Sequence, residues 1–494
     1  MNGYVFGIDV GTSSTKAVVV DEDGRIVRSA TREHVVDRPR VGHVEMPASV
    51  WWGEFVSLAE ELTFGLSEPI RAVGVSGMGP CVVLTDADGV PQRPAILYGI
   101  DTRAQQQISG LSAELGENEI LRRCGSVLTT QAVGPKLRWV AENEPEVWVR
   151  SSRIFMPSSW LVWKLTGAYW MDFHSASQCT PLFDTNDLTW YQPWADQIAP
   201  GIELPPLAWP GDLAGSMVGT IGGIPAGTSV IVGTIDAWTE SISVGATQPG
   251  DLMLMYGTTM FMIATVDAPI HLASMWGTIG AFEGTRNLAG GLATSGAITS
   301  WLKDLFGDPG YPSLLAEADT SGAGANGLLM LPYFAGERTP IMDPNARGTI
   351  VGLTLSHTRG DLYRAALEAT SLAVRHNVET MRAAGATIRR VVAVGGGTQG
   401  QLWTQIVSDV TGLSQVVPTV TVGASYGAAF LAASLFEKPS IEGWNPSMKV
   451  VNPDSAHREY YDRLYSLYRE LYPGTQDINH ALAAMQHDHN KETE

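Results

Sequence analysis

The chain opens with two apolar runs separated by a short polar turn. Within Val5–Asp21 the pattern predicts a strand carrying Asp9 near its end, a turn through Gly11–Ser14 and a second strand, Ala17–Val20. Two β-branched runs around a Gly/Ser/Thr turn are typical of a β-hairpin. An Asp in a buried strand is costly unless a donor or a cation meets it. We therefore interpret the tip as a phosphate site beside Asp9-bound Mg²⁺, with a plain surface hairpin as the alternative.

The same arrangement returns in the middle of the chain. Leu252–Thr265 is again an apolar strand, a Gly-Thr-Thr tip and an apolar strand. It follows a predicted strand, Thr228–Val232, and a predicted helix that begins at Asp236 and ends near Val244. A repeated unit indicates two similar lobes with both hairpin tips around one cleft. The helix dipole stabilises an N-terminal carboxylate by roughly 0.3 to 1 kcal/mol, so Asp236 is expected to be ionised and to accept a proton, with a plain N-cap as the alternative.

The remaining segments alternate between short apolar runs and longer amphipathic ones. Strands are expected over residues 25–31, 72–76, 82–85, 95–98, 327–332 and 390–394, and helices over 45–66, 301–320, 360–383, 423–433 and 460–472, with 110–200 mainly helical. This predicts an α/β protein with mixed sheets flanked by helices. Its expected domains are an N-terminal lobe (1–245), a C-terminal lobe (246–472) and a partly disordered tail (473–494).

Composition and charge narrow the class of protein. Hydrophobic residues make up 44% of the 494-residue chain and charged residues 17%, which is typical of a globular protein. The net charge of −19 argues against a nucleic-acid partner, because such binding depends on clustered Lys and Arg. The three cysteines have neither metal-ligand nor disulfide spacing. Since no leader and no membrane span are predicted, we expect a cytoplasmic protein without a membrane partner.

Three phosphate-binding or nucleotide-binding patterns can be compared. Gly395, Gly397 and Gly400 form the G-x-G-x-x-G spacing of dinucleotide sites, but Val416–Val422 lacks the acidic ribose ligand expected about 20 residues further on. The pattern therefore favours a nucleotide but not hydride transfer. A Walker P-loop is absent from the sequence. Two phosphate hairpins with two carboxylates favour phosphoryl transfer, which needs oxygen-bound Mg²⁺ and a carboxylate that accepts a hydroxyl proton.

Several longer motifs resemble those of one family. They are GIDVGTSSTK (7–16), KLRWVAENEP (136–145), VGTIDAW (232–238), YGTT (256–259), LPYFAGERTP (331–340), GGGTQGQLW (395–403) and the spacing of Gly, Leu, Asp and Glu over 348–368. In this order they are similar to the FGGY carbohydrate kinases, most closely the xylulokinase-like branch. The resemblance covers residues 3 to about 472.

The resemblance implies an actin-like, ribonuclease-H-like fold of two lobes, with ATP in the cleft between them. It implies that the ATP phosphates are bordered by Gly11, Thr12, Ser13 and Lys16 and by Gly257, Thr258 and Thr259, and the adenosine by Gly396, Gly397 and Gln401. Asp236 matches the general base that deprotonates the sugar hydroxyl, and Asp9 the carboxylate on the Mg²⁺ side. Asp9 and Asp236 are thus the candidate metal ligands.

The sugar end departs from the family pattern. The usual Gln-Met-His-Gly is replaced by Met78-Gly79-Pro80-Cys81, and the run that ends at Asp101 and Arg103 is one residue longer than usual. From the local sequence alone, we interpret this charged pair as a loop salt bridge. With the family resemblance, we expect it to form part of the sugar site. The expected substrate residues are Met78, Gly79, Pro80, Asp101, Arg103 and Asp236. D-xylulose is the leading substrate, with another pentulose such as ribulose, a tetrulose or a polyol as alternatives.

Two alternatives come from other classes of the same superfold. A non-catalytic nucleotide-switch protein, such as a chaperone, would need an appended domain, and only a short tail follows Tyr472. A sugar-responsive repressor would need a DNA-reading domain before Val5, where four residues precede. We therefore expect an enzyme whose partner is a small-molecule sugar. The oligomeric state, a homodimer included, stays open.

Overall fold

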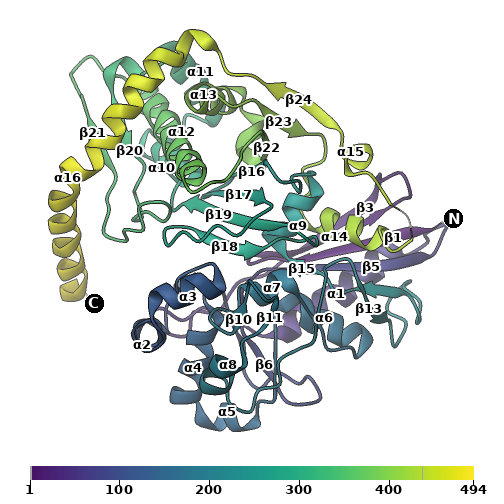
Figure 1. Cartoon of the computed structure of the whole chain (residues 1–494). Helices are drawn as coiled ribbons and strands as arrows, with labels where there is room; N and C mark the ends of the chain where they lie inside the picture. The colour runs from purple at the N-terminus through teal and green to yellow at the C-terminus, as the bar shows by residue number, and fades with distance from the viewer. Residues whose placement is uncertain (1–2, 437, 494) are drawn as a thin grey trace. The chain divides into compact units, whose positions relative to one another are not determined.

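The computed structural model describes residues 3–436 and 438–493, and Figure 1 traces their helices and strands in chain order. These residues form two compact units. Unit 1 consists of Met1–Gln248, Asp267–Asn287 and Val422–Pro446, and unit 2 of Pro249–Val266, Leu288–Thr421 and Ser447–Glu494. The continuous division at residue 245 thus differs from the observed one, because two later segments return to unit 1.

Unit 1 is built on a mixed sheet that contains the first predicted hairpin. Its strands are β1 (Tyr4–Val10), β2 (Ser14–Val20), β3 (Ile26–Glu33), β5 (Ile70–Gly77), β13 (Leu213–Ser216), β14 (Ser229–Ile231) and β15 (Thr234–Ile235). They follow the order β13-β14-β5-β1-β2-β3, with β15 also on β5. β1, β2 and β3 pair antiparallel, whereas β5 lies parallel to β1 and to β14. The hairpin is confirmed, and its second strand begins three residues earlier than predicted, at Ser14.

Helix α14 (Ala424–Ala433) explains why a late segment belongs to unit 1. A Cβ atom on Gly7 of β1 would lie 2.1 Å from the Ser425 carbonyl oxygen, and one on Gly74 of β5 would lie 1.9 Å from that of Ala428. The sheet and the helix therefore approach each other through positions where only glycine fits. This contact depends on residues more than three hundred positions apart in sequence.

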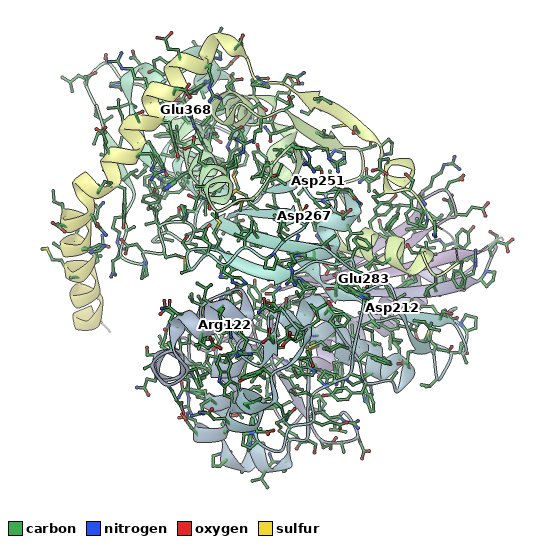
Figure 2. All side chains as sticks on the ribbon, viewed as in Figure 1. Arg122, Asp212, Asp251, Asp267, Glu283 and Glu368 are labelled. Carbon is green, nitrogen blue, oxygen red and sulfur yellow. The ribbon has the colours of Figure 1, made fainter. Side chains whose placement is uncertain are left out.

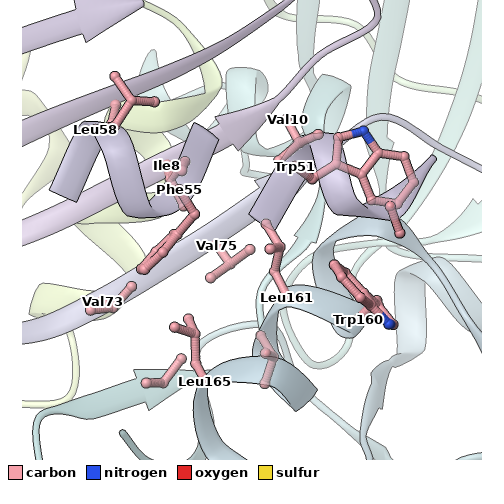
Figure 3. Close-up of a cluster of buried hydrophobic side chains, with 14 of the residues drawn as sticks. Ile8, Val10, Trp51, Phe55, Leu58, Val73, Val75, Trp160, Leu161 and Leu165 are labelled. Atoms are coloured by element: carbon pink, nitrogen blue, oxygen red, sulfur yellow. The ribbon is translucent and has the colours of Figure 1, made fainter. Parts of the chain in front are cut away.

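The hydrophobic core of unit 1 lies under α1 (Ala48–Thr63) and α6 (Pro157–Thr166). Figure 3 shows Trp51 and Phe55 of α1 together with Trp160 of α6 and apolar residues of the sheet strands. Helix α1 begins at Ala48 and not at Glu45 as predicted, because Glu45–Met46 forms a short strand, β4, that pairs with β7 (Ala95–Ile96).

The segment predicted to be mainly helical forms a second core in unit 1. Its helices are α2 (Gln105–Leu115), α3 (Glu117–Cys124), α4 (Val133–Asn143), α5 (Pro145–Arg150), α6, α7 (Phe173–Ser177) and α8 (Gln192–Ile198). Short strands accompany them: β6 (Val83–Thr85), β8 (Arg153–Phe155), β9 (Met171–Asp172), β10 (Phe183–Asp184), β11 (Thr189–Trp190) and β12 (Leu207–Ala208). Unit 1 also contains α9 (Asp236–Ser243), β18 (Trp276–Ile279) and α15 (Ile441–Trp444). The prediction of a mainly helical segment is confirmed.

Unit 2 repeats the sheet plan of unit 1. Its strands are β16 (Asp251–Tyr256), β17 (Met260–Val266), β19 (Arg286–Leu292, which begins in unit 1), β22 (Arg390–Val394), β23 (Gln415–Pro418) and β24 (Ser447–Val451). The order β19-β17-β16-β22-β23 matches β3-β2-β1-β5-β14 strand for strand. As in unit 1, the hairpin strand β16 is antiparallel to β17 and parallel to β22, which is parallel to β23. The predicted internal repeat is confirmed.

The helices of unit 2 include two that the sequence pattern predicted as a single helix. They are α10 (Gly296–Leu305), α11 (Tyr311–Ser321), α12 (Arg359–Ala383), α13 (Gln401–Thr411) and α16 (Arg458–Thr493), with β20 (Leu329–Leu331) paired to β21 (Thr349–Val351) and 3₁₀ turns at Ala325–Gly327, Gly396–Gln399 and Ser455–His457. The single helix predicted over 301–320 is wrong. The chain turns at Gly307, Asp308 and Gly310, whose φ angles are 77°, 57° and 79°, so α10 and α11 are separate.

The terminal helix is longer than predicted. Instead of ending at Tyr472, α16 continues to Thr493, through the segment expected to be partly disordered; Glu494 lies outside the described residues. Asp343 accepts hydrogen bonds from Tyr472 Oη at 2.6 Å and from His480 Nε2 at 2.7 Å. These contacts hold the helix beyond its predicted end.

A buried carboxylate links two helices of unit 2. Glu368 of α12, labelled in Figure 2, accepts hydrogen bonds from Arg364 Nε at 2.7 Å and from Tyr461 Oη of α16 at 2.9 Å. The backbone N–H of Gly324 donates to the same carboxylate.

Among the described residues, no helix combines the length and the apolar composition that crossing a membrane requires.

Candidate active site

The tip of the first hairpin is held by side chains that sequence analysis did not single out. His34 Nε2 lies 3.0 Å from the Gly11 carbonyl oxygen, and its Nδ1 lies 3.0 Å from the carboxylate of Glu54 on α1. The same carboxylate accepts a hydrogen bond from Thr15 Oγ1. The Gly11 carbonyl group is therefore held by an imidazole that Glu54 orients, which suits the phosphate-binding turn predicted here. No local motif marks His34 or Glu54, because they meet only through the packing of α1 on the sheet.

Three carboxylates gather at the carboxyl ends of β1 and β15. Asp9 accepts a 3.0 Å hydrogen bond from Ser76 Oγ and faces Lys16 across the hairpin. Asp236 is the first residue of α9 and accepts a 2.7 Å hydrogen bond from the Ala237 N–H, and Glu240 follows one turn later. The structure thus brings together Asp9 and Asp236, the two predicted metal ligands.

Burial and mutual repulsion raise the pKa values of these acids. Burial raises the pKa of Asp9 to about 6, against the opposing effects of Ser76 and Lys16. Burial and then the charge of Asp9 raise the pKa of Asp236 well above its ordinary value. Burial, again with Asp9, raises the pKa of Glu240 to about 7. The helix dipole, which was expected to favour the ionised form of Asp236, is opposed by burial and by the charge of Asp9.

This donor set fits a divalent cation. Carboxylates crowded around one exposed lysine, Lys16, lack compensating positive charge, and Mg²⁺ is bound by one or two carboxylates together with waters and substrate phosphates. Within residues 3–436 and 438–493, no three His, Cys, Asp or Glu side chains are arranged to hold a metal by themselves. A cation at Asp9 would therefore take further ligands from water and phosphate.

The other hairpin residues differ in where their side chains lie. Ser13 and Lys16 are exposed at the tip, where they are open to an incoming phosphate. The Thr12 hydroxyl instead lies 3.0 Å from Tyr98 Oη and 3.9 Å from Met78 Sδ. Thr12 therefore contacts residues near the expected sugar site as well as belonging to the predicted phosphate turn.

The loop after β5 lies next to the catalytic candidate. The Met78 N–H donates a 2.7 Å hydrogen bond to the Val10 carbonyl oxygen, and Met78 is buried. A Cβ atom on Gly79 would lie 2.7 Å from Cγ1 of Ile235, the residue before Asp236. The structure therefore places the predicted sugar loop, which includes the buried Pro80, beside Asp236.

Asp101 and Arg103 form a buried pair and not an exposed loop salt bridge. Arg103 donates to Asp101 from Nε at 3.0 Å and from Nη2 at 2.7 Å, and the Val44 N–H donates to the same carboxylate at 2.6 Å. Arg103 Nη1 also lies 2.7 Å from Glu45 Oε1, and its guanidinium lies 4.9 Å from the ring centroid of Trp139. The two side chains are brought together as predicted. Their hydrogen bonds go to each other and to neighbouring protein groups, so both side chains are held in fixed positions.

Lys136 of α4 begins the KLRWVAENEP motif, and it lies close enough to Asp101 and Cys81 to interact with them electrostatically. Its side chain is buried, and its Nζ has no hydrogen-bond partner in the described part of the chain. Burial lowers its pKa to about 8, with Cys81 and Asp101 opposing the shift. A buried ammonium without an acceptor is costly.

Unit 2 contains a cavity of about 910 Å³ at the second hairpin. It is lined by the predicted residues Gly257, Thr258, Gly396 and Gly397, and by Tyr256, Gly296, Ala297, Thr299, Ser300, Trp301, Asp304, Tyr311, Pro312, Leu315, Tyr363, Leu367, Gln399, Gly400 and Trp403. Thr259 and Gln401 are adjacent in sequence but are not among the lining residues. The aromatic and aliphatic walls suit a nucleoside, and they come from α10, α11, α12 and α13, so no single motif could reveal them.

The second hairpin tip is fixed by the start of α10. The backbone N–H groups of Ser295 and Ala297 each donate a 3.0 Å hydrogen bond to the Thr258 carbonyl oxygen, and that of Gly296 donates to Gly257. A Cβ atom on Gly296 would lie 2.6 Å from the Gly257 oxygen. Glycine at 296 is therefore required for this close contact.

Comparison with known proteins finds one family over most of the chain. The model of the FGGY family of carbohydrate kinases matches residues 4–241 with its N-terminal domain and 252–436 with its C-terminal domain. The xylulose kinase of Staphylococcus xylosus is 27% identical, with 95% of this chain and 99% of that protein covered. A glycerol kinase of Nocardia farcinica is 31% identical, with 87% and 90% covered. The solved xylulose kinase of Rhodospirillum rubrum superimposes with a TM-score of 0.91 at 30% identity, covering 97% and 100%, which confirms the predicted actin-like two-lobed fold. The chain belongs to the FGGY family of carbohydrate kinases.

Proposed function

We propose that this carbohydrate kinase transfers the terminal phosphoryl group of ATP to a hydroxyl group of D-xylulose or a closely related ketose or polyol. Family membership itself makes the protein a sugar kinase that uses ATP and a small-molecule acceptor, and it sets aside the nucleotide-switch and repressor alternatives. The observation that carries the proposal is the close contact of Gly79 with Ile235, because it puts the sugar loop beside Asp236.

Asp236 is the proposed general base. It begins α9 beside the sugar loop, so its carboxylate is placed to accept the proton of a sugar hydroxyl as that oxygen attacks phosphorus. Its backbone contact with the Ala237 N–H fixes the orientation of one carboxylate oxygen and leaves the other available. Glu240 is one turn further along the same helix and is a less direct candidate.

Asp9, together with Asp236, is the proposed Mg²⁺ site. Ser76 orients Asp9, and Lys16 faces it across the hairpin, so both residues stabilise negative charge at this edge of the sheet. When bound, Mg²⁺ neutralises charge that develops on the transferred phosphoryl group. The exposed Ser13 and Lys16 and the backbone of Gly11 and Thr12 are the proposed phosphate contacts in unit 1.

The cavity of unit 2 is the proposed nucleoside site. Gly257 and Thr258 would contact phosphate oxygens, while Gly396 and Gly397 leave room for the adenosine between the aromatic walls. A Cβ atom on Gly397 would lie 2.9 Å from Trp403, so a larger side chain there would fill this space. Thr259 and Gln401, which do not line the cavity, remain proposed contacts of the same ligand.

The identity of the sugar acceptor depends on the loop that follows β5. The relatives named xylulose kinase favour D-xylulose, whereas Met78 and Pro80 stand where Gln and His are expected in that branch. The thiol of Cys81 is buried, and its pKa is raised to about 12, so it offers a weak hydrogen bond at most. A site with fewer polar groups holds fewer hydroxyl groups, which favours small or less hydroxylated acceptors as alternatives.

The proposal is tested by ATP consumption in the presence of Mg²⁺ and a panel of acceptors. The panel contains D-xylulose, D-ribulose, a tetrulose, a hexulose, glycerol and other polyols. At least one of these is expected to raise ADP release far above the rate with water alone, with D-xylulose giving the highest kcat/KM. Stimulation by a different member would correct the substrate, and no stimulation by any of them would contradict the sugar-kinase proposal.

A further inference from the structure

The terminal helix α16 presents a row of apolar side chains on its outer surface. Leu467, Ile478, Leu482 and Met485 are 48%, 62%, 47% and 67% exposed. At 3.6 residues per turn, these and four further residues fall within about 80° of the helix circumference. We call this row the apolar strip, and it consists of Tyr460, Leu464, Leu467, Leu471, Gly474, Ile478, Leu482 and Met485. Single exposed apolar residues are ordinary, but a continuous row of them is typical of an interaction surface.

The N-terminal half of the strip borders a groove of about 590 Å³ in unit 2. Figure 1 shows α16 beside the two short strands β20 and β21, which supply Leu329 and Val351 to the groove. The facing wall comes from α16 and contains three leucines, which we call the groove leucines: Leu464, Leu467 and Leu471. Gly474 also lines the groove, and a Cβ atom there would meet no atom within 4 Å. The groove is therefore an apolar hollow with room for bulky side chains.

The C-terminal half of the strip is nearly free of charge. From Leu471 to Gln486 the sequence contains one acidic residue, Asp477, and no Lys or Arg. The whole chain has a net charge of −19, and such a charge opposes the association of two copies through mutual repulsion. That repulsion is weakest at this strip, which also offers no row of charges to a basic protein. The charge distribution therefore favours an apolar occupant with few charges of its own.

The strip is complementary to itself when a second copy is turned end to end. Going from Gly474 toward the N-terminus, the groove leucines are reached at Leu471 and then in steps of four and three residues. Going toward the C-terminus, three exposed apolar residues are reached at Ile478 and then in the same steps of four and three; we call Ile478, Leu482 and Met485 the distal residues. In an antiparallel pair of helices, the groove leucines of one copy therefore lie opposite the distal residues of the other.

We propose that the apolar strip binds a second copy of this chain through an antiparallel pair of α16 helices, with a two-fold axis near Gly474. The distal residues of each copy enter the groove of the other, so every contact occurs twice, as a two-fold interface requires. Helix separation depends on the side chains at the crossing point, so Gly474 permits a close approach. The strip is about 40 Å long at 1.5 Å per residue. None of its residues is assigned to ATP, Mg²⁺ or sugar, so the proposal is independent of the proposed function.

The proposal is tested by sedimentation equilibrium of the full-length protein over a range of concentrations. The wild type is expected to show twice the mass of one chain at micromolar concentration. Leu467→Glu and Leu482→Glu should each raise the dissociation constant of the dimer about tenfold or more, because an unpaired charge is costly in an apolar interface. The matched control is Val149→Glu, at an 84% exposed position of α5, which should leave the constant within about twofold.

Two further variants test the arrangement of the helices. Gly474→Cys places a thiol from each copy at the axis and should form an intermolecular disulfide on mild oxidation. Gly110→Cys, at an open position of α2, is its control and should not. The three native cysteines are buried and do not compete. Leu467→Lys combined with Leu482→Glu in one chain should dimerise more tightly than either change alone, because the two positions meet as opposite charges in the antiparallel pair.

Several results would overturn the proposal. A wild type that is monomeric at every concentration would show that the strip has a different occupant, and a dimer unaffected by both Glu variants would show that it forms elsewhere. An equal loss in Val149→Glu would indicate only a general effect of charge. A Lys–Glu combination as weak as the single variants, or equal cross-linking of Gly110→Cys, would contradict the antiparallel arrangement. Far-UV circular dichroism checks the folding of each variant, and if one Glu variant does not fold, the other and Gly474→Cys still decide the question.

Discussion

Gly79 and Ile235 are in direct contact, with room for no side chain on Gly79: a Cβ atom there would lie 2.7 Å from Ile235 Cγ1. Gly79 belongs to the loop that follows β5, and Ile235 precedes Asp236 at the start of α9. The contact couples the position of the proposed sugar loop to that of the proposed base. A side chain at position 79 therefore disturbs the sugar loop and the proposed base, while the unit 2 cavity is not lined by either residue.

Gly79→Ala is expected to lower kcat/KM for the acceptor about tenfold or more, because a displacement near 1 Å is costly at a reacting centre. The affinity for ATP should stay within about twofold of wild type, since the unit 2 cavity is untouched. Steady-state kinetics and nucleotide titration measure the two effects. Gly53→Ala, whose Cβ would meet no atom within 4 Å, is the control and should behave as wild type. Unchanged acceptor kinetics in Gly79→Ala would argue against the coupling.

Gly74→Ala is expected to reduce the free energy of unfolding by about 1 to 3 kcal/mol, because the new Cβ overlaps the backbone of α14. That Cβ atom would lie only 1.9 Å from the Ala428 carbonyl oxygen. Gly110→Ala, in the exposed part of α2 with no atom within 4 Å, should instead stabilise the protein slightly. Urea denaturation of both variants measures the difference. Equal stability of the two would contradict the close packing of α14 on the sheet.

Glu337 is expected to make the protein less stable as the pH rises from about 5 to 8. Burial raises its pKa from 4.5 to about 8, so the folded state favours the protonated form and ionisation costs stability throughout this interval. The N–H groups of Ala293 and Arg338 donate to one carboxyl oxygen, which Glu337→Gln retains. Relative to wild type, this variant should gain at least about 1 kcal/mol between pH 5 and pH 8. A constant difference in unfolding free energy across that range would contradict the prediction.

Lys136→Met is expected to stabilise the protein at pH 7 by about 1 kcal/mol or more, because it removes a buried ammonium that lacks an acceptor. The pKa of Lys136 is lowered to about 8, so the cost of its charge is complete below pH 8 and declines toward pH 10.5. The advantage of the variant should decline over the same range. Lys164→Met, at an exposed position of α6, is the control and should change stability by less than about 0.5 kcal/mol. A loss of stability in Lys136→Met at pH 7 would show that Nζ has a partner.

Local patterns were sufficient to predict the two hairpins, because each depends only on a run of β-branched residues and a short turn. They also predicted α12, whose long apolar face is continuous in sequence. They failed where two distant segments meet. The assignment of α14 to unit 1 depends on Gly7 and Gly74, and the division of residues 301–320 depends on the left-handed conformation of Asp308.

The candidate site shows the same limit. Asp9 and Asp236 could be identified from their places at the ends of a strand and of a strand-helix turn, and the family resemblance gave them roles. The raised pKa of Asp236 could not be predicted from the sequence, because it depends on burial and on the charge of Asp9. His34 and Glu54 were missed because they reach the hairpin from the end of β3 and from α1 through tertiary packing.

The central claim is that Asp236 accepts the proton of the sugar hydroxyl, and Asp236→Asn tests it most directly. Turnover with ATP, Mg²⁺ and the preferred acceptor should fall by about 10²- to 10⁴-fold, as removal of a general base implies, with ATP affinity retained. Glu240→Gln, which removes a neighbouring carboxylate on the same helix, should lose less than about tenfold. Near-normal turnover in Asp236→Asn, or an equal loss in Glu240→Gln, would contradict the assignment.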